Sequence, residues 1–148
     1  MKKVIAFLFA LGLWGCSAGD LQIEVIDFGE VSIQNCGSLN TDTELFFKIN
    51  GSEALILELA GGLIANEASE GEITSPIPGS SKLTYRIFSE AVNSGYFCDA
   101  IPPAKPRVLE DILAEDGEVR ITTVQDPSDS TRFEHTIRLA GISFVNEA

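Results

Sequence analysis

Apolar and polar residues alternate with a period of two along most of the 148-residue chain, and helical spacing is nearly absent. Successive side chains of a β-strand point to opposite faces of a sheet, so this alternation is typical of strands with one buried face. The pattern is clear at residues 21–26, 31–34, 44–49, 54–59, 83–88, 118–125, 133–139 and 142–144. Turn residues separate these segments, and we predict an all-β fold: an antiparallel β-sandwich of about eight or nine short strands, immunoglobulin-like or jelly-roll in outline.

Local signals predict how the strands connect. Asn50-Gly51 lies between two strand patterns and favours a type I′ hairpin turn, because both residues accept positive φ. Residues 60–82 lose the alternation and are rich in Gly, Pro and Ser, which indicates a long loop with one short edge strand near Ile73. We expect this loop to be mobile, and because loops on a rigid sandwich often carry binding sites, it is a first place to look for one.

Residues 107–114 fit two structures. Val108, Leu109, Ile112 and Leu113 lie at helical spacing, whereas the prolines before this stretch and Asp116-Gly117 after it favour a strand that enters a hairpin. We favour the strand, and we expect a further turn at 126–130, where Asp, Pro and Ser cluster.

The amino-terminal residues have the three zones of a secretory signal peptide. Lys2 and Lys3 give a positive start, Val4–Trp14 is uncharged and almost wholly apolar, and Gly15 is small. The apolar run is shorter than the roughly 20 residues that a membrane-spanning helix needs, so we expect the leader to be cleaved. Leu13-Trp14-Gly15-Cys16 resembles the bacterial lipobox, and in this segment the chain is similar to a bacterial lipoprotein precursor.

The lipobox resemblance implies that Cys16 becomes the first residue of the mature protein and carries several acyl chains, such as palmitate. Each buried methylene contributes about 0.8 kcal/mol, so several chains hold a protein firmly to a membrane. Ser17 is not the Asp that retains proteobacterial lipoproteins in the inner membrane, which implies the outer membrane and leaves the periplasmic or surface face open. We therefore divide the chain into a leader (1–15), an anchor and tether (16–20) and one sandwich domain (21–148).

The charge balance is strongly acidic, with 22 Asp and Glu against 10 Lys and Arg and a net charge of −12. Such a surface repels nucleic acid, so we exclude a nucleic-acid partner. The membrane is the expected partner through the lipid on Cys16, and a protein or glycan partner at the envelope stays open.

The three cysteines have different expected fates. Acylation of Cys16 leaves Cys36 and Cys98 as the only pair, and in an oxidising compartment they are expected to form a disulfide. They lack Cys-x-x-Cys spacing, and the chain has a single histidine, so a metal or redox site is disfavoured.

No group of residues indicates catalysis or a cofactor. His135 alternates in phase with Phe133 and Ile137, so it is expected to face the core rather than act as a base. Asp126 and Asp129 are weak calcium candidates, and Asp-Pro-Ser-Asp is equally explained by turn geometry.

We expect a lipid-anchored cell-envelope protein whose sandwich is a non-catalytic binding or structural domain. Two alternatives are a cell-envelope hydrolase that uses a carboxylate pair, and a surface adhesion or assembly subunit with an exposed sheet edge. Tyr85, Tyr96 and Phe97 are the aromatic candidates for glycan binding, but Tyr96 and Phe97 are expected to pack around the Cys36–Cys98 bridge.

Mass spectrometry of the purified mature chain tests the anchor. We expect its first residue to be Cys16, with acyl chains on both the thiol and the amino group, because several chains are needed for firm anchoring. A Ser17→Ala chain is the matched control and should be acylated in the same way. An unmodified amino terminus at another residue would contradict the lipobox assignment.

Overall fold

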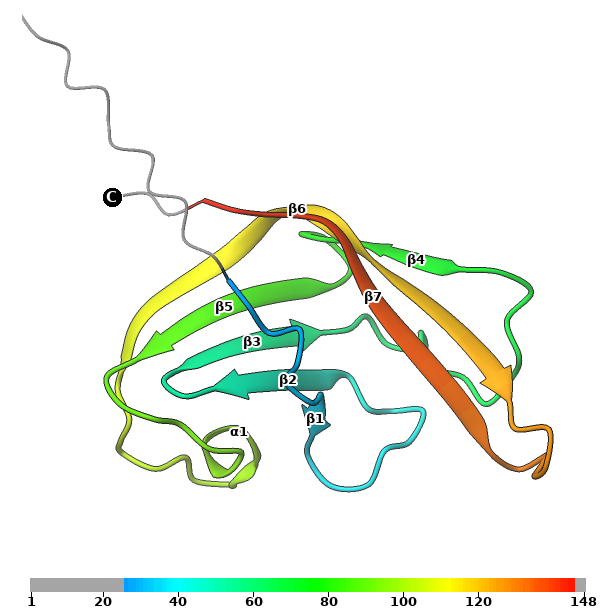
Figure 1. The fold of residues 1–148 in the computed structure, drawn as a ribbon, viewed down its shortest axis with the longest axis horizontal. Coiled ribbons are helices and arrows are strands. Elements are labelled where there is room, and N and C mark those ends of the chain that lie inside the picture. Colours follow the sequence, from blue (N-terminus) through cyan, green and yellow to red (C-terminus); the bar gives the residue numbers. More distant parts are fainter. Residues whose placement is uncertain (1–25, 146–148) are drawn as a thin grey trace, which may run out of the picture.

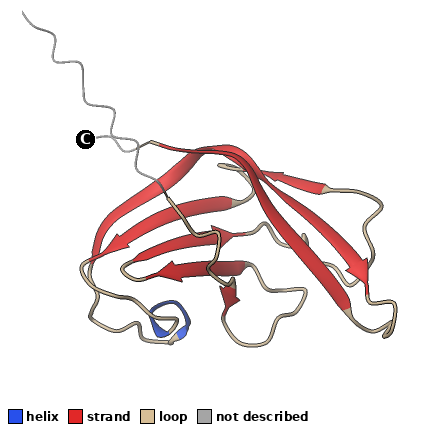
Figure 2. Ribbon diagram, in the orientation of Figure 1, coloured by secondary structure: helices blue, strands red, loops and turns tan. Residues whose placement is uncertain are grey.

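The structure, a computed structural model, describes residues 26–145, so the leader, Cys16 and residues 21–25 of the first predicted strand lie outside the described residues. Within this range nearly all regular structure is β-strand (Figures 1 and 2), and the predicted all-β fold is confirmed. In chain order the elements are β1 (Gln34–Asn35), β2 (Leu45–Asn50), β3 (Glu53–Glu58), β4 (Ile73–Pro76), β5 (Lys82–Phe88), α1 (Gly95–Cys98), β6 (Val108–Gln125) and β7 (Phe133–Phe144).

The strands form two antiparallel sheets that share β6. The first sheet has the order β1-β2-β3-β5 and ends with the first part of β6. In the second sheet the rest of β6 lies between β4 and β7. Figure 1 shows β6 following β5 and then continuing between β4 and β7. The two sheets pack against each other as in a β-sandwich.

β6 is one long strand where the sequence pattern predicts two. The strand preference for residues 107–114 is confirmed, but the hairpin predicted at Asp116-Gly117 is wrong. The chain passes through this dipeptide with shifts in the β6–β7 register between Ala114 and Asp116 and between Asp116 and Glu118. Such bulges bend a strand without ending it, which is why one strand serves both sheets.

A similar merger occurs in β7, which contains both strands predicted at 133–139 and 142–144. Gly141, with a φ of 63°, lies at the bulge opposite Gly117 and lets the strand continue. The described residues therefore hold seven strands, and the segment predicted at 31–34 contributes only the start of β1.

The predicted β2–β3 hairpin is confirmed, but its turn type differs. Asn50 pairs with Glu53, so Gly51 and Ser52 form the two-residue loop. Gly51 has a φ of 61°, and no described residue other than glycine has a positive φ. Because type I′ requires positive φ at both loop residues, the predicted type I′ turn is wrong.

The long loop predicted at 60–82 contains the expected edge strand, β4, and is attached to the domain at several points. Ile64 and Ile77 are buried in the core. Ser69 donates its amide hydrogen to the Thr123 carbonyl of β6, and its hydroxyl accepts the Thr123 amide hydrogen, both at 3.0 Å.

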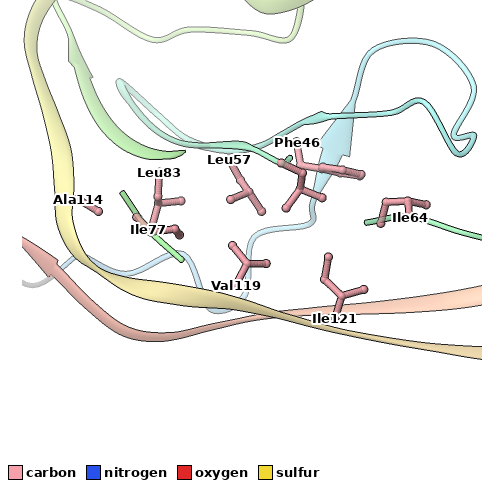
Figure 3. Close-up of a cluster of buried hydrophobic side chains, with 9 residues drawn as sticks. Phe46, Leu57, Ile64, Ile77, Leu83, Ala114, Val119 and Ile121 are labelled. Atoms are coloured by element: carbon pink, nitrogen blue, oxygen red, sulfur yellow. The ribbon is translucent and has the colours of Figure 1, made fainter. Parts of the chain in front are cut away.

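The core between the sheets is apolar and closely packed. Phe46, Leu57 and Leu83 of the first sheet point toward Val119 and Ile121 of β6 (Figure 3). Full burial of such side chains contributes about 1.5–3 kcal/mol each, which makes this contact the main force that holds the two sheets together.

The outer face of the first sheet is covered by α1 and a disulfide. Cys36 and Cys98 are bonded, as predicted, and close a loop with a sequence separation of 62 residues. Phe97 of α1 stacks on Phe47 with ring centroids 4.6 Å apart, and Tyr96 meets the Phe88 ring at 4.9 Å. The predicted packing of Tyr96 and Phe97 around the bridge is confirmed.

Gly117 is required by the bend in β6. Its φ is 129°, and a Cβ atom at this position would lie 2.6 Å from Ile142 Cδ1 and 3.0 Å from the Ala140 carbonyl oxygen. A side chain would therefore push β6 and β7 apart at the point where the sheets join.

Replacement of Gly117 by alanine should destabilise the protein. We expect Gly117→Ala to lower the free energy of unfolding by about 1–3 kcal/mol, because it adds backbone strain and a steric clash. Urea denaturation followed by circular dichroism measures this change. Gly71→Ala is the control, since no atom lies within 4 Å of the added Cβ there; equal effects at both positions would contradict the assignment.

Candidate functional site

His135 of β7 is paired with Thr123 of β6, and its Nδ1 lies 2.9 Å from the Thr123 hydroxyl oxygen. The imidazole is half-buried on the same face as Ile137, as the alternation predicts, and burial lowers the pKa of His135. Thr123 is only 4% exposed, so neighbouring residues cover most of its surface. The pair therefore acts as a cross-strand contact.

Asp126 and Asp129 both form local turn contacts. Asp126 Oδ1 accepts hydrogen bonds from the Ser128 amide (2.8 Å) and hydroxyl (2.6 Å), and Asp129 Oδ1 accepts from the Thr131 amide (2.9 Å) and hydroxyl (2.6 Å). These side-chain hydrogen bonds lower the pKa of both carboxyl groups. In residues 26–145, no cluster of three or more His, Cys, Asp or Glu side chains is placed to hold a metal ion.

An outer groove lies on the first sheet beside α1, with a volume of about 690 Å³. Tyr96, Phe97 and Pro102 line it together with two carboxylates, Glu44 and Glu58. The basic residues Lys82 and Arg86 also line it, and Arg86 donates from Nε and Nη2 to the Asp111 carboxylate, at 2.6 and 2.8 Å. The rings of Tyr96 and Phe97 also pack against the sheet, so the groove offers a ligand little free aromatic surface.

A second and more apolar cavity lies between the sheets, with a volume of about 480 Å³. We call it the inter-sheet cleft. Strands of the first sheet supply one wall, to which Phe46, Lys48, Leu55, Leu57 and Leu83 contribute. β7 and the amino-terminal segment supply the rest, formed by Ile137, Leu139, Ile142, Phe144, Ile26, Phe28, Gly29 and Ile33.

Aromatic rings fix one end of the inter-sheet cleft. Tyr85, which is 1% exposed, lies between Phe28 and Phe144, with ring centroids 6.3 and 6.1 Å away. These contacts hold the amino-terminal segment and the end of β7 against the first sheet. At the rim, Leu139 and Ile33 are 37% and 52% exposed, so apolar surface faces solvent there.

Among residues 26–145, Lys48 is the only ionisable side chain that lines the inter-sheet cleft. It lies in β2 in phase with Phe46, and its strand partner is Leu55, so the alternation places it on the inner face. Its Nζ donates a hydrogen bond to the Phe28 carbonyl oxygen at 2.9 Å. The sequence-based candidates did not include Lys48, and the signal that could have found it was a lysine in phase with core residues.

The fold and the inter-sheet cleft define an all-β, two-sheet domain with an apolar cavity. No family model matches the chain, and comparisons with curated proteins and with solved structures find no match. Among residues 26–145 there is no helix long and apolar enough to cross a membrane. A fold of this kind does not by itself indicate a function, which depends on the side chains of the site.

The buried imidazole should make stability depend on pH. Because the pKa of His135 is lower in the folded protein than the ordinary value of about 6.5, the unfolded chain binds more protons below that pH. We expect the free energy of unfolding to fall as pH drops from about 6.5 toward the folded pKa, and to change little above that range. Urea denaturation between pH 5 and 8 measures this dependence.

His135→Gln is the matched variant and should lose this part of the pH dependence. Because His135 is the only histidine, its ring signals in an NMR titration report the folded pKa directly. A titration midpoint at or above 6.5 would contradict the prediction.

Proposed function

We propose that this chain is a lipid-anchored cell-envelope protein whose β-sandwich is a non-catalytic binding module, and that its ligand occupies the inter-sheet cleft. The observation that carries the proposal is the cleft itself, a cavity of about 480 Å³ with apolar walls and one charged side chain. Small-molecule sites usually have volumes of about 300–1,000 Å³, mostly apolar walls and few polar groups. The inter-sheet cleft fits this description better than the outer groove does.

Packing also supports a binding role for the cleft. Protein interiors are close-packed, and voids larger than a water molecule are few. The part of the sandwich that β6 covers follows this rule, with Val119 and Ile121 at 0% and 1% exposure. Under β7 the space between the sheets is not filled by any of residues 26–145, and apolar side chains such as Leu139 are exposed at its rim. An apolar ligand would bury that surface.

The position of the anchor fits an apolar ligand. Ile26 and Phe28 line the cleft, so the chain that leads to Cys16 starts at the cleft. A chain of about ten residues reaches at most roughly 35 Å when extended. Acylation of Cys16 would therefore keep the cleft close to a membrane, where apolar molecules are concentrated.

The assembly-subunit alternative is favoured by one observation. β7 is twelve residues long and pairs only with β6, so within residues 26–145 its other edge has no partner strand. Long unpaired edges can accept a strand from another chain. This edge borders the cleft, and both roles predict contacts of β7 with a second molecule.

The hydrolase alternative has weaker support. Glu44 and Glu58 are the carboxylates of the outer groove. A general acid needs a raised pKa, whereas side-chain hydrogen bonds lower the pKa of the Asp126 and Asp129 carboxyl groups, which lie in a turn.

Photolabelling of the full chain in envelope membranes tests the binding role. The probe is a long-chain alcohol with a diazirine within the chain and a terminal alkyne. After irradiation, mass spectrometry should place the adducts on β3 and β7 around Leu55 and Leu139. Labelling confined to the outer groove, or no labelling at all, would overturn the proposal.

A matched pair of variants sharpens this test. Leu139→Glu places a carboxylate at the rim of the cleft, and Val124→Glu places one on exposed surface of β6. We expect Leu139→Glu to lower labelling about tenfold, because an apolar ligand cannot solvate the new charge. Val124→Glu should label as the unmodified chain does.

A further inference from the structure

The cleft combines apolar walls with a single cation. The chain has 22 acidic residues and 10 basic ones, yet the described residues that line the cleft include no acid and one lysine. Lys48 is half-buried, and a lysine that faces inward among apolar residues in a sandwich needs an explanation. The side chain of Lys48 is supplied by β2, opposite Leu55 on the inner face of the first sheet.

The contacts of Lys48 leave part of its ammonium group available. An ammonium group has three donors, and one of them reaches the Phe28 carbonyl oxygen at 2.9 Å. The ion pairs formed among residues 26–145 involve Arg86, Arg120 and Arg138, and none involves Lys48. Two donors can therefore face a further acceptor inside the cleft.

A purely structural role does not require a charge at this position. Residues 27–28 are also attached to β2 through Asn50, whose amide donates to the Asp27 carbonyl oxygen at 3.3 Å. The neutral amide of Asn50 thus makes the same kind of hydrogen bond to this segment, two residues further along β2 than Lys48. The contact with residues 27–28 therefore does not account for the positive charge of Lys48, whereas a ligand in the cleft would account for it.

The chemistry of the cleft restricts what that ligand is. Apolar walls suit a hydrocarbon chain, and an ammonium group at the wall suits an anionic head group. The acidic surface of the protein does not prevent this contact, because exposed charges farther away than about 10 Å are largely screened at 0.1 M salt. Within the part of the chain that the structure describes, no carboxylate lines the cleft to compete for Lys48.

We infer that the inter-sheet cleft binds a single-chain anionic amphiphile of the fatty-acid class, with its acyl chain between the sheets and its carboxylate on Lys48. This inference rests on the proposed function and adds the class of ligand. A volume of about 480 Å³ lies in the lower half of the usual range for ligand sites, which suits one chain rather than a lipid with two.

Two probes that differ only in the head group test the inference on the full chain in envelope membranes. One is a long-chain fatty acid with a diazirine within its chain, and the other is the alcohol of the same length. We expect the acid to label β3 and β7 about tenfold more than the alcohol at equal concentration, because a hydrogen bond to a charged group favours the acid.

Variants of Lys48 identify the head-group contact. Lys48→Met keeps the length and removes the charge, so the ratio of acid labelling to alcohol labelling should fall about tenfold, to near one. A circular dichroism spectrum and a urea unfolding midpoint close to those of the unmodified chain show that the variant is folded. Lys48→Arg should retain the preference for the acid, and Lys82→Met in the outer groove should change neither probe.

The outcomes separate this inference from the proposed function. Equal labelling of the cleft by acid and alcohol, or a preference for the acid that survives Lys48→Met, would overturn the inference and leave the binding module in place. Absence of cleft labelling by both probes would overturn both.

Discussion

The architecture depends on the unbroken passage of β6 from the first sheet into the second. Its first part pairs with β5 and its second part with β4 and β7, so one strand sets how the two sheets face each other. The bend requires a backbone conformation at Gly117 that a side chain would not fit. Close to β6, Val119 and Ile121 fill the space between the sheets. Residues of β6 do not line the cleft, which lies where β7 and residues 26–33 cover the first sheet.

The first sheet is apolar on both faces, and each face has its own cover. In β2, Phe46 points to the core between the sheets and Phe47 points to the outer face under α1. α1 has only four residues and cannot be stable alone. The Cys36–Cys98 disulfide at its last residue attaches it to the segment that precedes β2. In the chain-entropy model, closure of a loop of this length stabilises the fold by about 4 kcal/mol. The sandwich is therefore held by packing on one side and by a covalent bond on the other.

Sequence signals predicted structure well where the determinant was local. The β2–β3 hairpin follows from glycine at the turn, and the disulfide follows from the number of cysteines. The hairpin turn predicted at Asp116-Gly117 was wrong, because a glycine with positive φ fits a β-bulge as well as a turn. Only the partner strand decides between them, and here β7 continues past the bulge through Gly141. The cleft could not be predicted, because it brings together residues 26–33, three strands of the first sheet and β7.

Lys48 shows how a local departure from a pattern can mark a site. Alternation along β2 assigns Phe46 and Lys48 to the same inner face, and a lysine there conflicts with the apolar residues around it. Conflicts between local sequence and global fold are expected mainly at functional or strained sites. The backbone of β2 is regular, with every residue in register with β3, so strain does not account for this one. Since Asn50 also ties the amino-terminal segment to β2, the charge of Lys48 is best explained by an anionic group in the cleft.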